Sequence, residues 1–199
     1  MFPPPENSET SHSKSIRCSG AEFSAEERAF LLRIAHQSIE SAAQGRGFTM
    51  DPPSPHLAEL RGVFTTVYLD KELRGCVGYP LAIAALYRAV AETAKAAAFE
   101  DLRFPPLQTD EIPRLEISLS VLSPLSPIRP EEVEIGRHGL VISQGNHRGL
   151  LLPQVPVEHG WDRITFLEQT CKKAGLPKDA WQHGAAIEAF TAEVFGDGE

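Results

Sequence analysis

The stretch GVFTTVYLDKELRGCVG, residues 62–78, is the strongest indicator of the fold in this sequence. Its first part, 62–69, is rich in β-branched and aromatic residues, which favour strands. Asp70-Lys71-Glu72 forms a predicted turn, and 73–78 follows as a second strand. Together these residues predict an antiparallel β-hairpin.

Helical patterns lie on both sides of this hairpin. Ser24 and Glu27 have the S-x-x-E spacing of a capping box, so we expect a helix to begin there. From Pro80 onwards the apolar spacing becomes helical, with a predicted stripe of Ile83, Leu86, Val90 and Ala97. Asp162 is a predicted N-cap for a further helix, whose inward side chains are Phe166, Leu167, Cys171 and Ala174.

Strand patterns recur in the second half of the chain. Residues 115–122, LEISLSVL, alternate between apolar and polar side chains. HGLVIS and RGLLLP read as two strands joined by a turn at 144–147, and 187–195 reads as one closing strand. Hairpins mixed with helices, without a regular βαβ order, predict an α+β fold: a largely antiparallel sheet with flanking helices.

Length and charge restrict the class of protein. The 199 residues, 42% of them hydrophobic, suffice for one domain over 21–199, preceded by a Pro- and Ser-rich segment, 1–20, that we expect to be a mobile tail. A formal net charge of −8 argues against a nucleic-acid partner. No apolar run has the length of a signal peptide or membrane span, so we expect a cytoplasmic protein without membrane association.

Three cysteines, Cys18, Cys76 and Cys171, are an odd number without C-x-x-C spacing. This argues against a disulfide framework or a cysteine zinc site, and we expect reduced thiols. The histidines show no metal-binding spacing either, so we predict no metal and no cofactor. Cys18 falls in the expected tail, and Cys171 lies on an apolar helical stripe that indicates core packing.

Cys76 is the strongest candidate for a reactive group. On a regular strand Arg74 and Cys76 project to the same side, with Leu73 and Val77 on the other, and a nearby guanidinium favours the thiolate. Gly75 and Gly78 permit close approach of either another backbone or a ligand. The alternative is that Cys76 is a small buried hydrophobic residue, the commoner role of free cysteine.

Three further residues have polar side chains that chemistry at Cys76 would need. His138 is a candidate base or, alternatively, a residue that shapes a strand entry. Glu116 either pairs with Arg74, orients a ligand or base, or simply faces solvent. Arg103 either binds an anion or forms a salt bridge that holds its loop.

A family resemblance rests on these same segments. LRGCVG, 73–78, resembles the signature Leu-Arg-Gly-Cys-Ile-Gly of the AMMECR domain family, with Val77 in place of isoleucine. Residues 96–124 and 136–181 are similar to the central and C-terminal blocks of that family, particularly in its prokaryotic members. The resemblance covers about 22–195, nearly all of the chain outside the expected tail.

This resemblance implies an α+β fold of a larger and a smaller lobe, with the signature facing the cleft between them. It also implies a bacterial or archaeal protein of the AmmeMemoRadiSam system protein A type, linked to a Memo-like protein and a radical-SAM protein. This chain has no C-x-x-x-C-x-x-C motif, so it is not the radical-SAM component. The family supplies no settled biochemical activity.

Two hypotheses for function remain. The first is an enzyme acting on a small or peptide substrate, with Cys76 as nucleophile, Arg74 lowering the thiol pKa or holding an anionic substrate, and His138 as base. The second is a non-catalytic binding or adaptor module that uses the same cleft, with Cys76 structural and a partner segment or metabolite as ligand. An activated thiol favours the first, and an exposed apolar patch beside an inert thiol favours the second.

Overall fold

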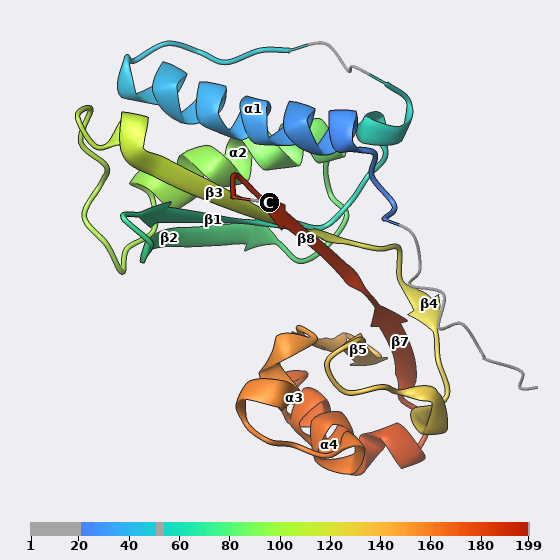
Figure 1. Ribbon diagram of the computed structural model, residues 1–199. Coiled ribbons are helices and arrows are strands. Elements are labelled where there is room, and N and C mark those ends of the chain that lie inside the picture. The colour runs from blue at the N-terminus through green and yellow to red at the C-terminus, as the bar shows by residue number, and fades with distance from the viewer. Residues whose placement is uncertain (1–20, 51–53, 199) are drawn as a thin grey trace, which may run out of the picture.

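The computed structural model describes residues 21–50 and 54–198, and it contains two four-stranded antiparallel sheets, each packed against its own helices (Figure 1). The strands are β1 Val63–Leu69, β2 Glu72–Tyr79, β3 Leu115–Leu122, β4 Ser126–Pro127, β5 Gly139–Gln144, β6 His147–Leu151, β7 Ala186–Phe190 and β8 Ala192–Gly196. The α-helices are α1 Ala25–Ala43, α2 Leu86–Phe99, α3 Gln154–Glu158 and α4 Arg163–Lys173. Short 3-10 turns occur at His56–Ala58, Ile112–Arg114, Pro130–Glu132 and Ala180–Gln182. The α+β prediction is confirmed.

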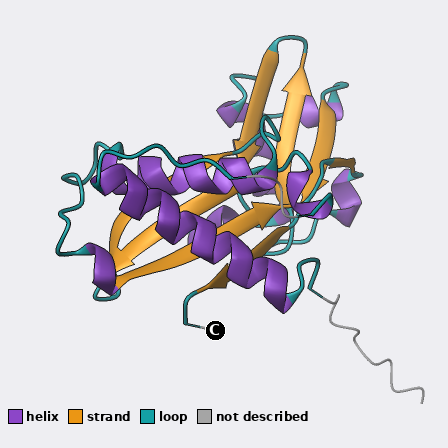
Figure 2. Ribbon diagram, turned by 90° about the horizontal axis from the view of Figure 1, so that it is seen from above, coloured by secondary structure: helices purple, strands orange, loops and turns teal. Residues whose placement is uncertain are grey.

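The part that we call the first lobe, residues 21–50, 54–122 and 192–198, contains the sheet of order β2-β1-β3-β8. Helices α1 and α2 pack on one face of this sheet, as Figures 1 and 2 both show. Alternate strand residues point toward these helices and are fully buried, including Val63, Val67 and Leu119. On the opposite face, which we call the open face, lie the side chains of the strand residues that alternate with these buried ones.

The second lobe, 126–190, contains the sheet of order β4-β7-β5-β6. Helix α4 covers one face of it, and Phe166, Leu167 and Cys171 are fully buried there beside Leu140 and Ile142. The predicted N-cap is confirmed, because the Asp162 side chain accepts from the Thr165 amide. The prediction that Cys171 is a core residue is also confirmed.

The lobes meet at the open face of the first sheet (Figure 1). Leu122, Val141 and Phe190 form a small apolar cluster between them, and Phe64 of β1 and Leu150 of β6 pack against it. The chain passes between the lobes twice, at 123–125 and at Thr191. These two crossings are hydrogen-bonded to each other, since the Ser123 amide donates to the Thr191 carbonyl and the Thr191 amide donates to Ser123 Oγ.

The capping box at the start of α1 is present as predicted. Ser24 Oγ accepts from the Glu27 amide, and the Glu27 carboxylate accepts from the Ser24 amide at 2.9 Å. The hairpin is also confirmed, with a turn at Asp70 and Lys71, whose φ angles are +51° and +69°. Positive φ at two consecutive residues gives a turn whose twist matches that of the flanking strands.

Two elements differ from the predictions by more than one or two residues at an end. Helix α2 begins at Leu86, and Ile83 lies before it and is exposed, because Ala85 is still extended and forms a β-bridge with Leu60. The single strand predicted over 187–195 is two strands in different sheets: β7 pairs with β5, and β8 pairs with β3. The change of sheet occurs at Thr191, where the chain crosses between the lobes.

Cys18 and the expected tail, 1–20, lie outside the described residues. In the part of the chain that the structure describes, no helix combines the length and apolarity that a membrane crossing needs.

Candidate functional site

Cys76 lies on β2, an edge strand of the first sheet, and its half-buried side chain belongs to the open face. It pairs across the ladder with Thr66 of β1, whose neighbours Thr65 and Val67 point toward the helices. Thr66 Oγ1 donates a hydrogen bond to Cys76 Sγ over 3.3 Å. Thr66 in turn pairs with Ser118 of β3, so a thiol and two hydroxyl-bearing residues occupy one row across three strands.

A β-bulge at Arg74 puts Cys76 on this face. Val67 pairs with Gly75 whereas Tyr68 pairs with Leu73, so Arg74 is an extra residue on β2. Without the bulge, Cys76 would pair with the buried Thr65 and point toward the helices. The expectation that Leu73 lies opposite Cys76 is therefore wrong: Leu73, paired with Tyr68, shares the open face with it.

The free edge of β2 at Cys76 is paired with side chains instead of a neighbouring strand. The Cys76 amide donates to Oδ2 of Asp101 at 2.9 Å, and Nη2 of Arg103 donates to the Cys76 carbonyl at 3.1 Å. An edge strand otherwise leaves such groups available for other chains. The loop after α2 therefore fixes the backbone of Cys76.

Asp101 and Arg103 form a two-point ion pair beside the thiol. Arg103 Nε lies 3.0 Å from Oδ1 of Asp101, and Nη2 lies 2.7 Å from Oδ2. The Arg103 guanidinium and the Cys76 amide hold the pKa of Asp101 far below its ordinary value. Asp101 in turn raises the pKa of Arg103, with a smaller contribution from the nearby Cys76 thiol. Arg103 thus forms a salt bridge, one of the two predicted roles, and its guanidinium is bonded to the Cys76 carbonyl.

Arg74 points away from the thiol and holds the same loop further along. Its guanidinium donates to the Pro105 and Pro106 carbonyls and lies 3.2 Å from Oε2 of Glu111. The pKa of Glu111 is lowered, first by the hydrogen bond from the Gln108 amide and then by Arg74. The guanidinium at Cys76 therefore comes from Arg103 and not from Arg74, which corrects the expected pairing.

At the two glycines of the signature, the space that a side chain would need is occupied by other parts of the protein. A Cβ on Gly75 would collide with the carbonyl oxygen of Ala97 in α2, so the close approach there is by helix backbone. A Cβ on Gly78 would collide with the Phe64 ring. Of the two sequence alternatives for these glycines, packing is the one that the geometry favours.

The structure does not bring His138 to Cys76. His138 lies in the second lobe, where its Nδ1 accepts from the Glu134 amide at 3.0 Å, and burial followed by the Arg137 charge lowers its pKa. Glu116 is exposed on β3 opposite Tyr68, so it shares the open face with Cys76, while Arg74 pairs with Glu111 instead. The structure thus adds Asp101 and Thr66 to the predicted residues around Cys76.

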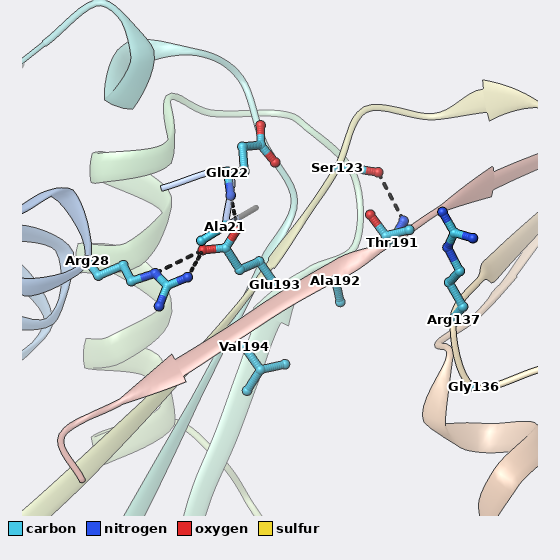
Figure 3. Close-up of a pocket in the computed structure, with 10 residues that line it drawn as sticks. All are labelled: Ala21, Glu22, Arg28, Ser123, Gly136, Arg137, Thr191, Ala192, Glu193 and Val194. Atoms are coloured by element: carbon cyan, nitrogen blue, oxygen red, sulfur yellow. Dashed lines mark hydrogen bonds and ion pairs between the residues drawn. The ribbon is translucent and has the colours of Figure 1, made fainter. Parts of the chain in front are cut away.

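Two cavities lie where the lobes meet. One, of about 730 Å³, lies along β8 at the sheet edge opposite Cys76, and Figure 3 shows Arg28 of α1 and Glu193 of β8 paired on its wall. The other, of about 390 Å³, lies beyond the end of β2. Neither has Cys76 in its lining. Within the described residues, no group of three or more His, Cys, Asp or Glu side chains is placed to hold a metal ion.

Comparison with known proteins gives matches over nearly the whole described chain. The family model described as AMMECR1 matches residues 32–195. Protein MK0488 of Methanopyrus kandleri is 44% identical over 192 residues, which are 90% of this chain and 93% of that protein. A protein of Thermococcus onnurineus is 45% identical over 181 residues, 83% of this chain and 88% of its own.

A solved structure shows the same architecture. The crystal structure of the uncharacterized protein PH0010 from Pyrococcus horikoshii aligns with a TM-score of 0.69 and 40% sequence identity. The alignment covers 86% of this chain and 91% of that one. The names of these archaeal relatives state no activity.

Proposed function

This chain belongs to the AMMECR1 family, and we propose that it is a thiol-dependent enzyme acting on a small or peptide substrate at the open face, with Cys76 as the nucleophile. The observation that carries the proposal is the hydrogen bond from the Thr66 hydroxyl to Cys76 Sγ, together with the Arg103 guanidinium bonded to the carbonyl of the same residue. A hydrogen-bond donor and a cation next to a thiol both stabilise the thiolate, the nucleophilic form.

The rigidity around Cys76 also supports a nucleophilic role. Its backbone amide and carbonyl are both held by the Asp101–Arg103 pair, and Gly75 is packed against α2. Catalysis gains when a reacting atom is held in place before the substrate arrives. The Cys76 backbone thus has a fixed position, and its half-buried side chain lies on the open face.

The proposed chemistry is attack of the Cys76 thiolate on an electrophilic carbon of the substrate. A carbon–sulfur bond forms, and the leaving group departs with the electron pair of its own bond. The proposal does not use His138, because its Nδ1 already accepts from the Glu134 amide in the other lobe. The Memo-like and radical-SAM partners that the resemblance implies stay predictions.

The test is the rate of alkylation of Cys76 by iodoacetamide between pH 6 and 9, measured by mass spectrometry. Buried Cys171 serves as an internal control for intact folding. We expect Cys76 to react faster than N-acetylcysteine at neutral pH, and Arg103→Met to slow it while Arg137→Met does not. A Cys76 that stays unlabelled in the folded protein would overturn the proposal.

A second candidate, a binding or adaptor module, is favoured by apolar side chains exposed beside Cys76. Leu102 is fully exposed between Asp101 and Arg103, and Leu73 is 43% exposed on the face of Cys76. A contact surface would need these two side chains to belong to one apolar patch. An inert Cys76 in the alkylation experiment would make this candidate the leading one.

A further inference from the structure

The cavity of about 390 Å³ has a lining drawn from both lobes, and we call it the seam pocket. Leu60 and Leu81 line it from the first lobe, Leu125 from a crossing between the lobes, and Phe190 from the second lobe. Its volume is at the lower end of the range for small-molecule sites. It lies apart from the open-face site, since Cys76 is not among its lining residues.

The walls of the seam pocket are mainly apolar. Leu122 and Phe190 belong to the apolar cluster between the lobes, and Leu125 packs against that cluster. At the mouth, Leu60 is 59% and Leu81 39% exposed. Apolar side chains that surround a hollow and remain in contact with water would be covered by an apolar ligand.

The charged residues of this lining are two arginines, Arg61 and Arg148. Arg148 projects from β6 toward the first lobe, on the side of its sheet opposite Gly149, which packs on α4. Its nearest carboxylate, on Glu188, is 3.9 Å from Nη2, too far for a hydrogen bond. Arg148 therefore has hydrogen-bonding capacity for an anion at the pocket.

Arg61, the other arginine of the lining, is not available to a ligand. Its side chain is 94% buried and ion-paired with Glu22 and Glu59 through Nη2, yet Nη1 has no hydrogen-bond partner among the described residues. That nitrogen also has almost no solvent-accessible surface, so a ligand in the pocket could not reach it. Because two carboxylates already neutralise Arg61, a ligand anion belongs at Arg148.

From the apolar walls and Arg148, we propose that the seam pocket binds an amphipathic carboxylate: a small molecule with an apolar chain or ring and one carboxylate group. The apolar part lies among Leu60, Leu81, Leu125 and Phe190, and the carboxylate pairs with Arg148. This site is independent of the thiol chemistry proposed for Cys76.

The proposal is tested by isothermal titration of the full chain with decanoate, butyrate and decan-1-ol, each below its aggregation concentration. We expect saturable binding of decanoate. Butyrate, with six fewer methylenes, is expected to bind at least about tenfold more weakly. Decan-1-ol, which lacks the charge, is expected to be weaker by about tenfold, the value of one charged hydrogen bond.

Variants then locate the site. Arg148→Met keeps an apolar stem at an exposed position. It is expected to weaken the binding of decanoate by about tenfold and to leave the binding of decan-1-ol unchanged. Arg137→Met, at an exposed arginine of the other cavity, is the matched control and should change neither. Leu60→Ser should weaken the binding of both decanoate and decan-1-ol.

Several results would overturn the proposal: no saturable decanoate binding, equal binding of decanoate and decan-1-ol, or equal losses in Arg148→Met and Arg137→Met. Cys76→Ser should bind decanoate as the natural chain does. A failure at the seam pocket would thus leave the thiol proposal standing, and an unreactive Cys76 would leave the pocket proposal standing.

Discussion

The Cys76 amide donates a hydrogen bond of 2.9 Å to Oδ2 of Asp101, and the same oxygen lies 2.7 Å from Nη2 of Arg103. One carboxylate therefore joins an edge strand, a loop and a cation at a single point. The Asp101 side chain is nearly buried, at 7% exposure, whereas Arg103 reaches solvent. Asp101 is thus the residue on which the arrangement around Cys76 depends.

Asp101→Asn should weaken the contacts that join Cys76, residue 101 and Arg103 without removing the side chain. The amide can still accept from the Cys76 N–H, but it loses the charged pairing with Arg103, so we expect a loss of about 1–2 kcal/mol in unfolding free energy at pH 7. Urea unfolding followed by circular dichroism measures the loss. Asp110→Asn, at an exposed loop aspartate, is the control and should change little.

The pKa of Asp101 also predicts how this stabilisation depends on pH. Because the folded-state pKa is depressed, the stabilisation is complete above the unfolded-state value of about 3.9. It is lost progressively as the pH falls below that value toward the lower folded-state pKa. The stability difference between the natural chain and Asp101→Asn should therefore shrink as the pH falls from 5 to 2.5. A difference that stays constant over this range would contradict the prediction.

Gly75→Ala should be severely destabilising. The added methyl group would collide with the Ala97 carbonyl oxygen, which belongs to helix backbone and cannot rotate away. We expect a loss of about 3 kcal/mol or more, since overpacking against backbone forces the strand and α2 apart. Gly47→Ala is the matched control, because its Cβ would meet no atom within 4 Å. Thermal unfolding of both variants measures the contrast.

The sequence predicted the elements better than their register. The strand alternation of 115–122, the capping box at Ser24 and the cap at Asp162 are local signals, and each element forms as expected. The bulge at Arg74 has only an ambiguous local signal in LRGCVG, since Gly75 fits either a bulge or a close approach of another backbone. It nevertheless decides which face Cys76 occupies, because a shift of one residue exchanges the two faces of a strand.

The candidate site could be predicted only in part for the same reason. Cys76 and Arg103 were found from their residue types, but Arg74 was placed beside the thiol by regular alternation, which the bulge interrupts. Asp101 lies 25 positions from Cys76, and only the packing of α2 on β2 brings the loop after that helix to the strand edge. Tertiary contacts of this kind leave no periodic pattern in a single sequence.

Ser123→Ala should loosen the crossing between the lobes. The Thr191 amide would lose the Ser123 Oγ acceptor, 3.0 Å away, at a cost of about 1 kcal/mol. Hydrogen exchange should show faster exchange at Thr191. Ser126→Ala, at an exposed strand position three residues on, should leave that amide unchanged. Unaltered exchange at Thr191 in Ser123→Ala would contradict the role of this hydrogen bond.

Thr66→Val tests the donor to the thiol directly. Valine has nearly the shape of threonine and the same β-branching, so the strand is retained while the hydrogen bond to Cys76 Sγ is removed. We expect alkylation of Cys76 to slow by about tenfold, the value of one hydrogen bond to a charged group, because the thiolate loses a donor. Thr66→Ser should restore the rate, and Ser118→Ala, on the next strand of the same row, should leave it unchanged. If Thr66→Val and Ser118→Ala slow the reaction equally, the effect comes from the polarity of the open face as a whole, and the specific activation of Cys76 by Thr66 is wrong.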